Sequence, residues 1–404
     1  MKANYKWREV LIPEVLYFQE GPGVRNTQFR ETGVKLLNVG NINNGVINLT
    51  STKTHLSEEE AYGKYSHFLV DDGDLLIACS GIIVENFHNK IAFASSEHLP
   101  LCLNTSTMRF KPLNKSNIDI LFFKYYLQTE KFKSQLVKLI TGSAQLNFGP
   151  SHIKKIKLPL PPLPQQQKIA NILDAADVLR QNDKALIAKY DELTQALFLD
   201  MFGDPVSNPK GWNQFALKHF GKISTGNTPS RSDDANYSTR HIEWIKTDNI
   251  KENNLYITQA SEYLSEVGLK KARTVEKDAI LVACIAGSID SIGRAALTDR
   301  KVSFNQQINA IESNSNVRPK YLYYLIRNCK KHIQNHASNG MKRMLTKGEF
   351  EKILMILPSL ELQNQFAERV TIIEEQIAIA QKSLDKSESL FNSLLQKAFK
   401  GDLV

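Results

Sequence analysis

The sequence contains little cysteine and no long apolar run. Its 404 residues include only four cysteines, which lack the regular spacing of a disulfide framework, so we expect free thiols in a reducing compartment. The longest apolar run, Ile280 to Ala286, is far shorter than the roughly 20 residues of a membrane-spanning helix. The N-terminal segment also lacks the apolar stretch of a secretory signal. These absences predict a cytoplasmic protein without membrane contact.

Motifs for the common DNA-modifying chemistries are missing as well. No GxxxxGK[ST] phosphate-binding loop occurs, which excludes hydrolysis of nucleoside triphosphates by that route. The segment Asn208-Pro209-Lys210-Gly211 is the nearest match to the Asn-Pro-Pro-aromatic motif of an amino-methyltransferase, and it lacks the second proline. No glycine-rich loop stands where it would bind a methyl donor. We therefore expect a protein that is not an enzyme and holds no cofactor.

Two clusters of potential metal ligands have simpler explanations. Cys329, His332 and His336 lie at i, i+3 and i+7, but a fourth ligand and the glutamate of HExxH are missing. We interpret them as a helix face near DNA or solvent, with zinc binding as the less favoured alternative. The aspartates of Asp71–Asp74 directly precede an apolar run, where acidic turn residues are common. We expect a solvated turn there rather than the metal site of a nuclease.

What the sequence does contain is an excess of positive charge. Lys and Arg number 51 against 42 for Asp and Glu, giving a formal net charge of +9. This excess favours a polyanionic partner such as nucleic acid, although an ordinary basic protein remains an alternative. The length exceeds that of a single common domain and indicates two or more.

The most informative feature is an internal repeat of about half the chain length. Trp7 corresponds to Trp212, and Gly21 to Gly226. Further pairs follow in the same order: VKLLNVGNI from Val34 with IEWIKTDNI from Ile242, VDDGDLLIAC from Val70 with VEKDAILVAC from Val275, Tyr125-Tyr126-Leu127 with Tyr323-Tyr324-Leu325, Gly142 with Gly340, and Lys155-Ile156 with Lys352-Ile353. Because the landmarks keep their order with only small insertions, we interpret the chain as two copies of one module.

Each copy predicts an α+β domain followed by a long helix. Short β-prone runs separated by turn residues precede a helical stretch at 119–140 or 319–336. Proline-containing stops then end each globular part and frame a helix start. We therefore expect globular domains at 1–158 and 206–357, with helical segments at 159–205 and 358–404.

Both helical segments carry apolar residues at alternating spacings of three and four, as coiled-coil seams do. The predicted seam is formed by Ile169, Ile172, Ala176, Leu179, Leu186, Leu193 and Leu197 in the first helix, and by Phe366, Val370, Ile373, Ile377, Ala380, Leu384, Phe391, Leu394 and Ala398 in the second. Asp183 and Ser387 interrupt it, either fixing the register or tolerating a wet position. We expect the helices to pair as an antiparallel coiled coil, the alternative being that each packs on its own domain.

Loops in both copies are rich in side chains that can bond DNA. Arg and Lys suit guanine edges or phosphates, and Asn and Gln can bond adenine bidentately. Any one of them, taken alone, is better explained as a surface or phosphate contact. The candidates are Arg25, Asn26, Gln28, Arg30, Asn89, Lys90, Ser143, Gln145 and Asn147 in the first copy, and Thr225, Asn227, Thr228, Arg231, Gln306, Asn339, Lys342 and Arg343 in the second.

At this point the chain resembles a known family over nearly its whole length. The segments EGPGVRNTQFRETGVKLLNVGNI, TGSAQLNFGPSHIKKIKLPLPPLPQQQKIA and KGWNQFALKHFGKISTGNTP look like the domain openings, loop and helix entry of the specificity subunits of type I restriction-modification systems. That family usually has a Glu-Gln pair at the helix entry, where this chain has Gln165-Gln166 and Glu361-Leu362-Gln363. The second double proline is also reduced to Pro358.

The resemblance implies two target-recognition domains on double-stranded DNA, with helical spacers that dock two methyltransferase subunits and recruit a motor-nuclease subunit. S-adenosylmethionine and ATP would then belong to the partners. Because the two helices correspond while the loops differ, we expect a bipartite, asymmetric target. The alternatives are a standalone coiled-coil DNA-binding scaffold or regulator and, less favoured, a nuclease with an unrecognised carboxylate set.

Overall fold

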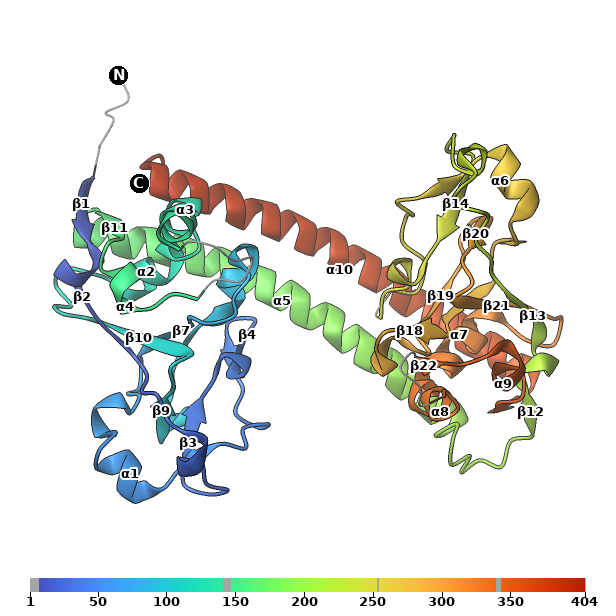
Figure 1. Ribbon diagram of the computed structural model, residues 1–404, viewed down its shortest axis with the longest axis horizontal. Helices are drawn as coiled ribbons and strands as arrows, with labels where there is room; N and C mark the ends of the chain where they lie inside the picture. Colours follow the sequence, from blue (N-terminus) through green and yellow to red (C-terminus); the bar gives the residue numbers. More distant parts are fainter. Residues whose placement is uncertain (1–6, 141–146, 253, 339–342, 404) are drawn as a thin grey trace. The chain divides into compact units, whose positions relative to one another are not determined.

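The computed structural model describes residues 7–140, 147–252, 254–338 and 343–403, except for the side chain of Arg343. The chain divides into two compact units. The first unit comprises residues 1–184 and 382–404, and the second comprises residues 185–381. Each unit therefore contains one globular domain and parts of both long helices (Figure 1). None of the helices in the described part of the chain combines the length and apolar character that crossing a membrane requires.

The first globular domain is built on two small sheets and a strand pair. The four-stranded antiparallel sheet has the order β2-β10-β7-β8, the three-stranded sheet the order β6-β3-β9, and β1 pairs with β11. The bounds are β1 Arg8–Leu11, β2 Leu16–Glu20, β3 Val34–Leu37, β4 Ile42–Asn43, β5 Val46–Ile47, β6 His55–Leu56, α1 Glu58–Tyr62, β7 Leu75–Ala78, β8 Ile91–Phe93, β9 Leu101–Leu103, β10 Thr107–Pro112, α2 Ile120–Tyr126, α3 Glu130–Leu139, α4 Pro150–Ile153 and β11 Lys157–Leu160.

The second globular domain repeats this plan. Its sheets have the orders β13-β21-β17-β19 and β15-β14-β20-β16, and β12 pairs with β23. The bounds are β12 Gln214–Ala216, β13 Gly221–Thr225, β14 Ile242–Ile245, β15 Tyr263–Leu264, α6 Glu266–Lys271, β16 Thr274–Val275, β17 Ile280–Ala283, β18 Ile285–Ala286, β19 Ala295–Leu297, β20 Val302–Phe304, β21 Ile308–Ser313, α7 Pro319–Asn328, α8 Lys330–Asn335, β22 Arg343–Met344, α9 Lys347–Phe350 and β23 Leu354–Ile356. The matching orders of the four-stranded antiparallel sheets, and of β6-β3-β9 with β15-β14-β20, confirm the tandem repeat, whereas β16 and the pairs β4–β5 and β18–β22 each belong to one domain only.

Shared polar and glycine contacts explain why the two copies keep the same landmarks. Asn41 and Asn249 are both buried, and the side-chain oxygen of each accepts a bond from a backbone N–H three residues earlier, at 2.8 and 3.0 Å. At Gly21 and Gly226 an added Cβ would lie 2.4 Å and 2.3 Å from backbone atoms of Asn104 and Asn305, respectively. Both copies therefore require a glycine at that close approach.

The tyrosine landmark of the repeat, paired in the sequence as Tyr125 with Tyr323, is aligned one residue differently in the structure. The backbone N–H groups of Asp119 and Arg318, which cap α2 and α7, bond equivalent glutamines of the two long helices. These caps are 199 residues apart, so Tyr125 corresponds to Tyr324 and not to Tyr323. Both tyrosine hydroxyls donate to carboxylates on the long helices, Tyr125 to Asp174 and Tyr324 to Glu374.

The acidic turn before β7 differs from its predicted solvated form. Asp74 is 2% exposed, and its carboxylate lies 3.4 Å from Nη1 of Arg109 and 3.3 Å from Nζ of Lys111. Desolvation raises the pKa of the Asp74 carboxyl, while the two cations lower it. The prediction was wrong for Asp74 because its partners lie on β10, more than thirty residues away. Asp71 and Asp72 are exposed, as expected for a turn.

The four cysteines are free and buried. Burial raises the thiol pKa of each, Cys79, Cys102, Cys284 and Cys329, to about 12. Cys329 therefore faces the core of the second unit, which corrects the predicted DNA- or solvent-facing position of this residue. The rings of His332 and His336 meet edge to face, with their centres 4.9 Å apart. Over the described residues, no three His, Cys, Asp or Glu side chains are grouped to hold a metal ion.

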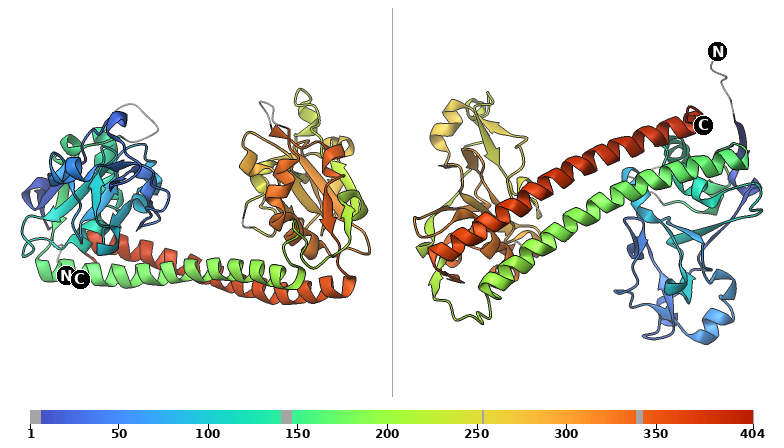
Figure 2. Two further views of the ribbon diagram at one scale, coloured as in Figure 1. Left: turned by 90° about the horizontal axis from the view of Figure 1, so that it is seen from below. Right: turned by 180° about the vertical axis from the view of Figure 1, so that it is seen from behind.

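The helices α5, Leu163–Phe202, and α10, Leu360–Lys400, pack together in antiparallel orientation within both units (Figure 2). In the first unit the start of α5 shares a core with the end of α10, and the guanidinium of Arg180 lies 4.3 Å from the ring centre of Phe391. In the second unit Phe198 and Phe202 of α5 contact Phe366 of α10 edge-on. Each domain also packs on both helices. The helices therefore pair with each other and pack on the domains at the same time, so both alternatives drawn from the sequence hold.

The polar interruption of the seam is a hydrogen-bonded pair. The hydroxyl of Ser387 donates to the carboxylate of Asp183 at 2.7 Å, and Lys184 pairs with Glu388 at 3.1 Å in the next positions. Ser387 is 9% exposed. A buried polar partner of this kind favours one register of the two helices over the others.

The predicted seam is wrong at three positions of α5. Leu179, Leu186 and Leu193 are 53%, 42% and 50% exposed. The inward positions are one residue further along, where Arg180 covers Phe391 and Thr194 is 2% exposed. Since one residue turns a helix by about 100°, the pattern of leucines indicated a face next to the true seam. The remaining predicted positions are buried or half-buried: Ile169, Ile172, Ala176, Leu197, Phe366, Val370, Ile373, Ile377, Ala380, Leu384, Phe391, Leu394 and Ala398.

The corrected seam predicts opposite outcomes for two leucines of α5. Leu173, which is fully buried in the core of the first unit, should lose about 2–5 kcal/mol of stability in a Leu173→Ala variant because a cavity remains. Leu179→Ala removes the same atoms from an exposed position and should change stability by less than about 0.5 kcal/mol. Thermal denaturation followed by circular dichroism measures both. An equal loss of stability in the two variants would show that Leu179 is part of the buried seam after all.

Candidate nucleic-acid interface

The loop after β2 presents two of its predicted DNA contacts outward. Arg25 and Asn26 are exposed at the start of the short 3₁₀ turn Asn26–Gln28. Gln28 instead holds the loop in place, since its amide donates to Glu60 at 2.8 Å and to the hydroxyl of Tyr65 at 3.1 Å. The guanidinium of Arg30 donates to the carbonyls of Thr27 and Phe29 in the same turn. Gln28 therefore supports the loop, and Arg25 and Asn26 are free to reach a ligand.

A second group of candidates lies in the 3₁₀ segment Val84–Lys90. The ammonium of Lys90 donates to the carbonyls of Val39 and Ile42, at 3.1 and 2.9 Å, and to the side chain of Asn43 at 2.5 Å. Desolvation at this position lowers the pKa of Lys90. The backbone carbonyl of Asn89 accepts from Gly45 at 3.3 Å. Both residues thus attach the β4–β5 hairpin to this segment.

The described part of the loop before α4 contains Asn147. Its side-chain oxygen accepts from the hydroxyl of Ser80 at 2.9 Å and from the N–H of Gly81 at 2.8 Å. The contact joins this loop to the turn that follows β7, and the side chain of Asn147 remains exposed. Ser143 and Gln145, predicted in the same loop, lie outside the described residues.

In the second unit several candidates form hydrogen bonds within their own domain. Asn227 donates to the carbonyl of Lys271 and accepts from the N–H of Arg273, both at 2.7 Å. The hydroxyl of Thr225 donates to Asn309 at 2.6 Å, and that of Thr228 bonds Gln306. These contacts define the turn after β13, with the exposed Gln306 at its edge. Asn339 and Lys342 lie outside the described residues, and Arg343 is placed only by the pairing of β22 with β18.

Arg231 is the best-positioned cation among the predicted contacts of the second unit. Its guanidinium lies 4.6 Å and 4.8 Å from the ring centres of Tyr237 and Trp244, and it pairs with Glu262 at 2.5 Å. The second carboxylate oxygen of Glu262 binds Lys246 at 2.5 Å, and these bonds lower the pKa of Glu262. The side chain of Arg231 nevertheless remains 55% exposed, which leaves a preoriented donor edge for a base or a phosphate.

Sequence reasoning missed the residues that orient Arg231. Glu262, Tyr237 and Trp244 come from separate segments, and no local motif links them to the arginine. A neighbouring hollow is lined by Arg231, Tyr237, Thr239, Arg240, Ser261, Glu262 and Tyr263. In it Arg240 lies 5.0 Å from the ring centre of Tyr263. The hollow therefore joins two stacked guanidiniums, a combination suited to an anionic, planar ligand such as a nucleotide.

Comparison with known proteins identifies the family of the chain. Residues 5–189 and 209–388 match the family described as "Type I restriction modification DNA specificity domain". The HindI specificity subunit of Haemophilus influenzae is 30% identical over 203 residues, a match that spans 48% of this chain and 42% of that protein. The MjaIX specificity subunit of Methanocaldococcus jannaschii is 23% identical over 354 residues, or 83% of this chain and 80% of that protein.

A solved structure shows the same fold. The S subunit of the type I restriction-modification system from M. genitalium superposes with a TM-score of 0.57 over 98% of both chains, at 16% identity. The family match covers both halves of the chain and describes a DNA specificity domain, in agreement with the expectation of a non-catalytic DNA-recognition protein. The chain therefore belongs to the family of type I restriction-modification DNA specificity domains, of which it carries two copies in tandem.

Proposed function

We propose that the chain is the specificity subunit of a type I restriction-modification enzyme and that each globular domain reads one half of a bipartite, asymmetric DNA target. The observation that carries the proposal is the contrast between framework and loops. The strand orders, the buried Asn41 and Asn249, and the glycines at Gly21 and Gly226 are shared by the two copies. The exposed side chains on this framework differ, and different side chains read different bases.

The long helices support the bipartite reading. Helices α5 and α10 contain 40 and 41 residues, which corresponds to about 60 Å each at 1.5 Å per residue. A rod of that length exceeds one turn of DNA, about 34 Å. We infer that the paired helices keep the two domains apart, so that a gap without sequence preference separates the half-sites.

The predicted readers can be tested one domain at a time. Replacing Arg25 and Asn26 by alanine should relax base preference in one half of the target, and Arg231→Ala should relax it in the other half. Each lost bidentate base contact costs about 1–3 kcal/mol of discrimination, or roughly 5- to 150-fold. Methylation-site mapping in cells that express the chain with its methyltransferase partner measures both halves.

Lys382→Ala, an exposed cation on α10, is the matched control and should leave both halves unchanged. Relaxed preference in both halves from a folded single-domain variant would contradict modular reading. Cleavage of DNA by the isolated chain with Mg²⁺ would instead favour the nuclease alternative.

We further propose that the helices dock two methyltransferase subunits and that these recruit the motor-nuclease subunits. The support is apolar surface that the pairing of the helices leaves uncovered. Within the second unit Leu186 and Leu193 lie seven residues apart on α5 and are 42% and 50% exposed, and Ile372 and Ile379 of α10 are 61% and 60% exposed. Exposed apolar side chains of this kind suit an apolar helix of a partner protein. S-adenosylmethionine and ATP would be bound by those partners.

Docking on these side chains predicts a specific loss of partner binding. Replacing Leu186 and Leu193 by glutamate should leave the fold intact, because both side chains are exposed, and should abolish co-purification of the methyltransferase. Lys189→Glu, an exposed charge change on the same helix, should retain it. Undiminished partner binding by the leucine variant would place the docking surface elsewhere. A chain that never co-purifies with a methyltransferase would favour the standalone regulator.

A further inference from the structure

One buried glutamine joins each domain to its long helix. Gln166 and Gln363 are both the fourth residue of their helices, α5 and α10, and both are 0% exposed. A primary amide in such a place must find partners for its oxygen and for its NH₂ group, because an unmet buried polar group is unfavourable. We call this junction between a domain and its long helix the joint. The partners of each glutamine show which segments meet there.

In the first unit Gln166 contacts three backbone groups. Its side-chain oxygen accepts from the N–H of Asp119 at 2.9 Å. Its NH₂ group donates to the carbonyls of Asn117 at 3.0 Å and Pro161 at 2.8 Å. Asp119 caps α2, and Pro161 belongs to the proline stop. One side chain thus links the first turn of the long helix, the segment that enters the helix, and the start of a helix in the globular domain.

The second unit repeats the contact with an equivalent set of backbone groups. The oxygen of Gln363 accepts from the N–H of Arg318 at 2.8 Å, and its NH₂ group donates to Asn316 at 3.2 Å and Pro358 at 3.0 Å. The α-helix cap has changed from aspartate to arginine, yet all three bonds persist. Both copies therefore place the same amide in the same three backbone bonds, with an asparagine and a proline among the partners each time.

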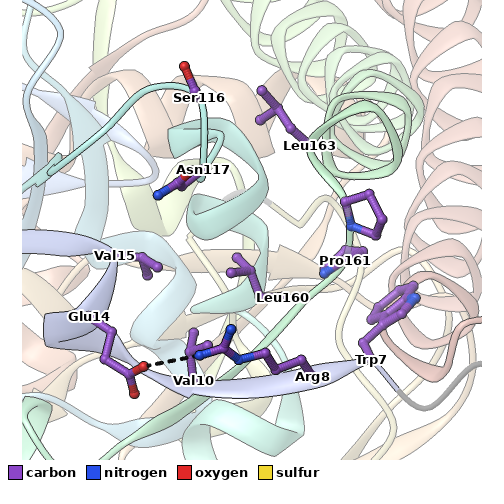
Figure 3. A pocket seen from close by; sticks show the side chains of 11 residues that line it. Trp7, Arg8, Val10, Glu14, Val15, Ser116, Asn117, Leu160, Pro161 and Leu163 are labelled. Atoms are coloured by element: carbon purple, nitrogen blue, oxygen red, sulfur yellow. Dashed lines mark ion pairs between the residues drawn. The ribbon is translucent and has the colours of Figure 1, made fainter.

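Packing and hydrogen bonds act together at the first joint, since Ile169, Ala170 and Leu173 of α5 lie in the core of the first unit. A hollow of about 640 Å³ lies beside the joint, with Asn117 on one side and Pro161 and Leu163 on the other (Figure 3). Its lining comes from β1, the segment before α2 and the proline stop. At the first turn of α5, beside this hollow, the directional hydrogen bonds of Gln166 add a constraint on angle to the packing of the following turns.

We propose that Gln166 and Gln363 are positioning residues that fix the direction in which each recognition domain leaves its helix, and thereby the number of base pairs between the two half-sites. This rests on the proposed function. A side chain of similar length without hydrogen bonds, as in Gln166→Met, removes the three bonds while the core contacts of α5 remain, so the domain stays attached but its angle at the start of the helix is less restricted. The loops that read bases are untouched, so the half-site sequences should not change.

The first experiment maps methylation sites for the full chain co-expressed with its methyltransferase partner. For Gln166→Met we expect the same two half-sites, with at least a tenfold loss of discrimination between the native gap and gaps one base pair longer or shorter. Gln167→Met is the matched control, since Gln167 is exposed in the same helical turn, and it should keep the native gap. Unchanged gap selectivity in a folded Gln166→Met variant would overturn the proposal.

The second experiment measures the joint without DNA. Spin labels on Glu59→Cys in α1 and Asn182→Cys in α5 report a distance within the first unit, and both positions are exposed. The native thiols are buried with pKa values of about 12 and should not be labelled. Double electron–electron resonance should show a broadened distance distribution for Gln166→Met and an unchanged one for Gln167→Met. A distribution as narrow as in the parent protein would contradict a positioning role.

Variants in the second unit keep the test independent of folding in the first. Gln363→Met, with the exposed Gln365→Met as its control, should alter gap selectivity in the same way. Gln166→Asn keeps an amide with a shorter reach and is the milder variant if Gln166→Met unfolds. If the parent protein directs no bipartite methylation, the proposed function fails, whereas the distance measurement still decides whether the glutamine positions the domain.

Discussion

The structure depends on satisfying one buried amide at the point where a globular domain becomes a helix. A domain that reads DNA must be held rigidly, yet the segment that leaves it contains proline and offers few backbone donors. Gln166 and Gln363 solve this by bonding the entering segment and the cap of a domain helix at the same time. The direction of each long helix is thereby fixed relative to its own domain. Each unit is therefore a globular domain held at a set angle on its long helices.

The long helices pair through one face and expose apolar side chains elsewhere. Their inner face includes the Asp183–Ser387 hydrogen bond and the Arg180–Phe391 contact among mostly apolar pairs. Specific polar pairs restrict the register. The apolar leucines that would normally form the seam stand outward on α5. These exposed leucines are the side chains for which we propose a partner protein.

Local sequence patterns predicted the architecture, whereas the roles of single polar residues depend on contacts with distant parts of the chain. The repeat, the α+β domains and the paired helices followed from landmarks and periodicity that are visible along the chain. The role of Lys90 did not, because its acceptors Val39, Ile42 and Asn43 lie about fifty residues away. Gln28 was likewise predicted to meet DNA and instead bonds Glu60 and Tyr65. Polar loop residues look alike in sequence whether their partner is DNA or their own fold.

The central claim is that the paired helices set the distance between two independently reading domains. The most direct test inserts seven residues after Leu186 and seven after Leu384, which keeps both helical faces in phase. Each helix then grows by about 10 Å, or roughly three base pairs at 3.4 Å each. Methylation-site mapping with the methyltransferase partner should show the same half-sites with a gap longer by about three base pairs. A folded, active variant with an unchanged gap would contradict the account.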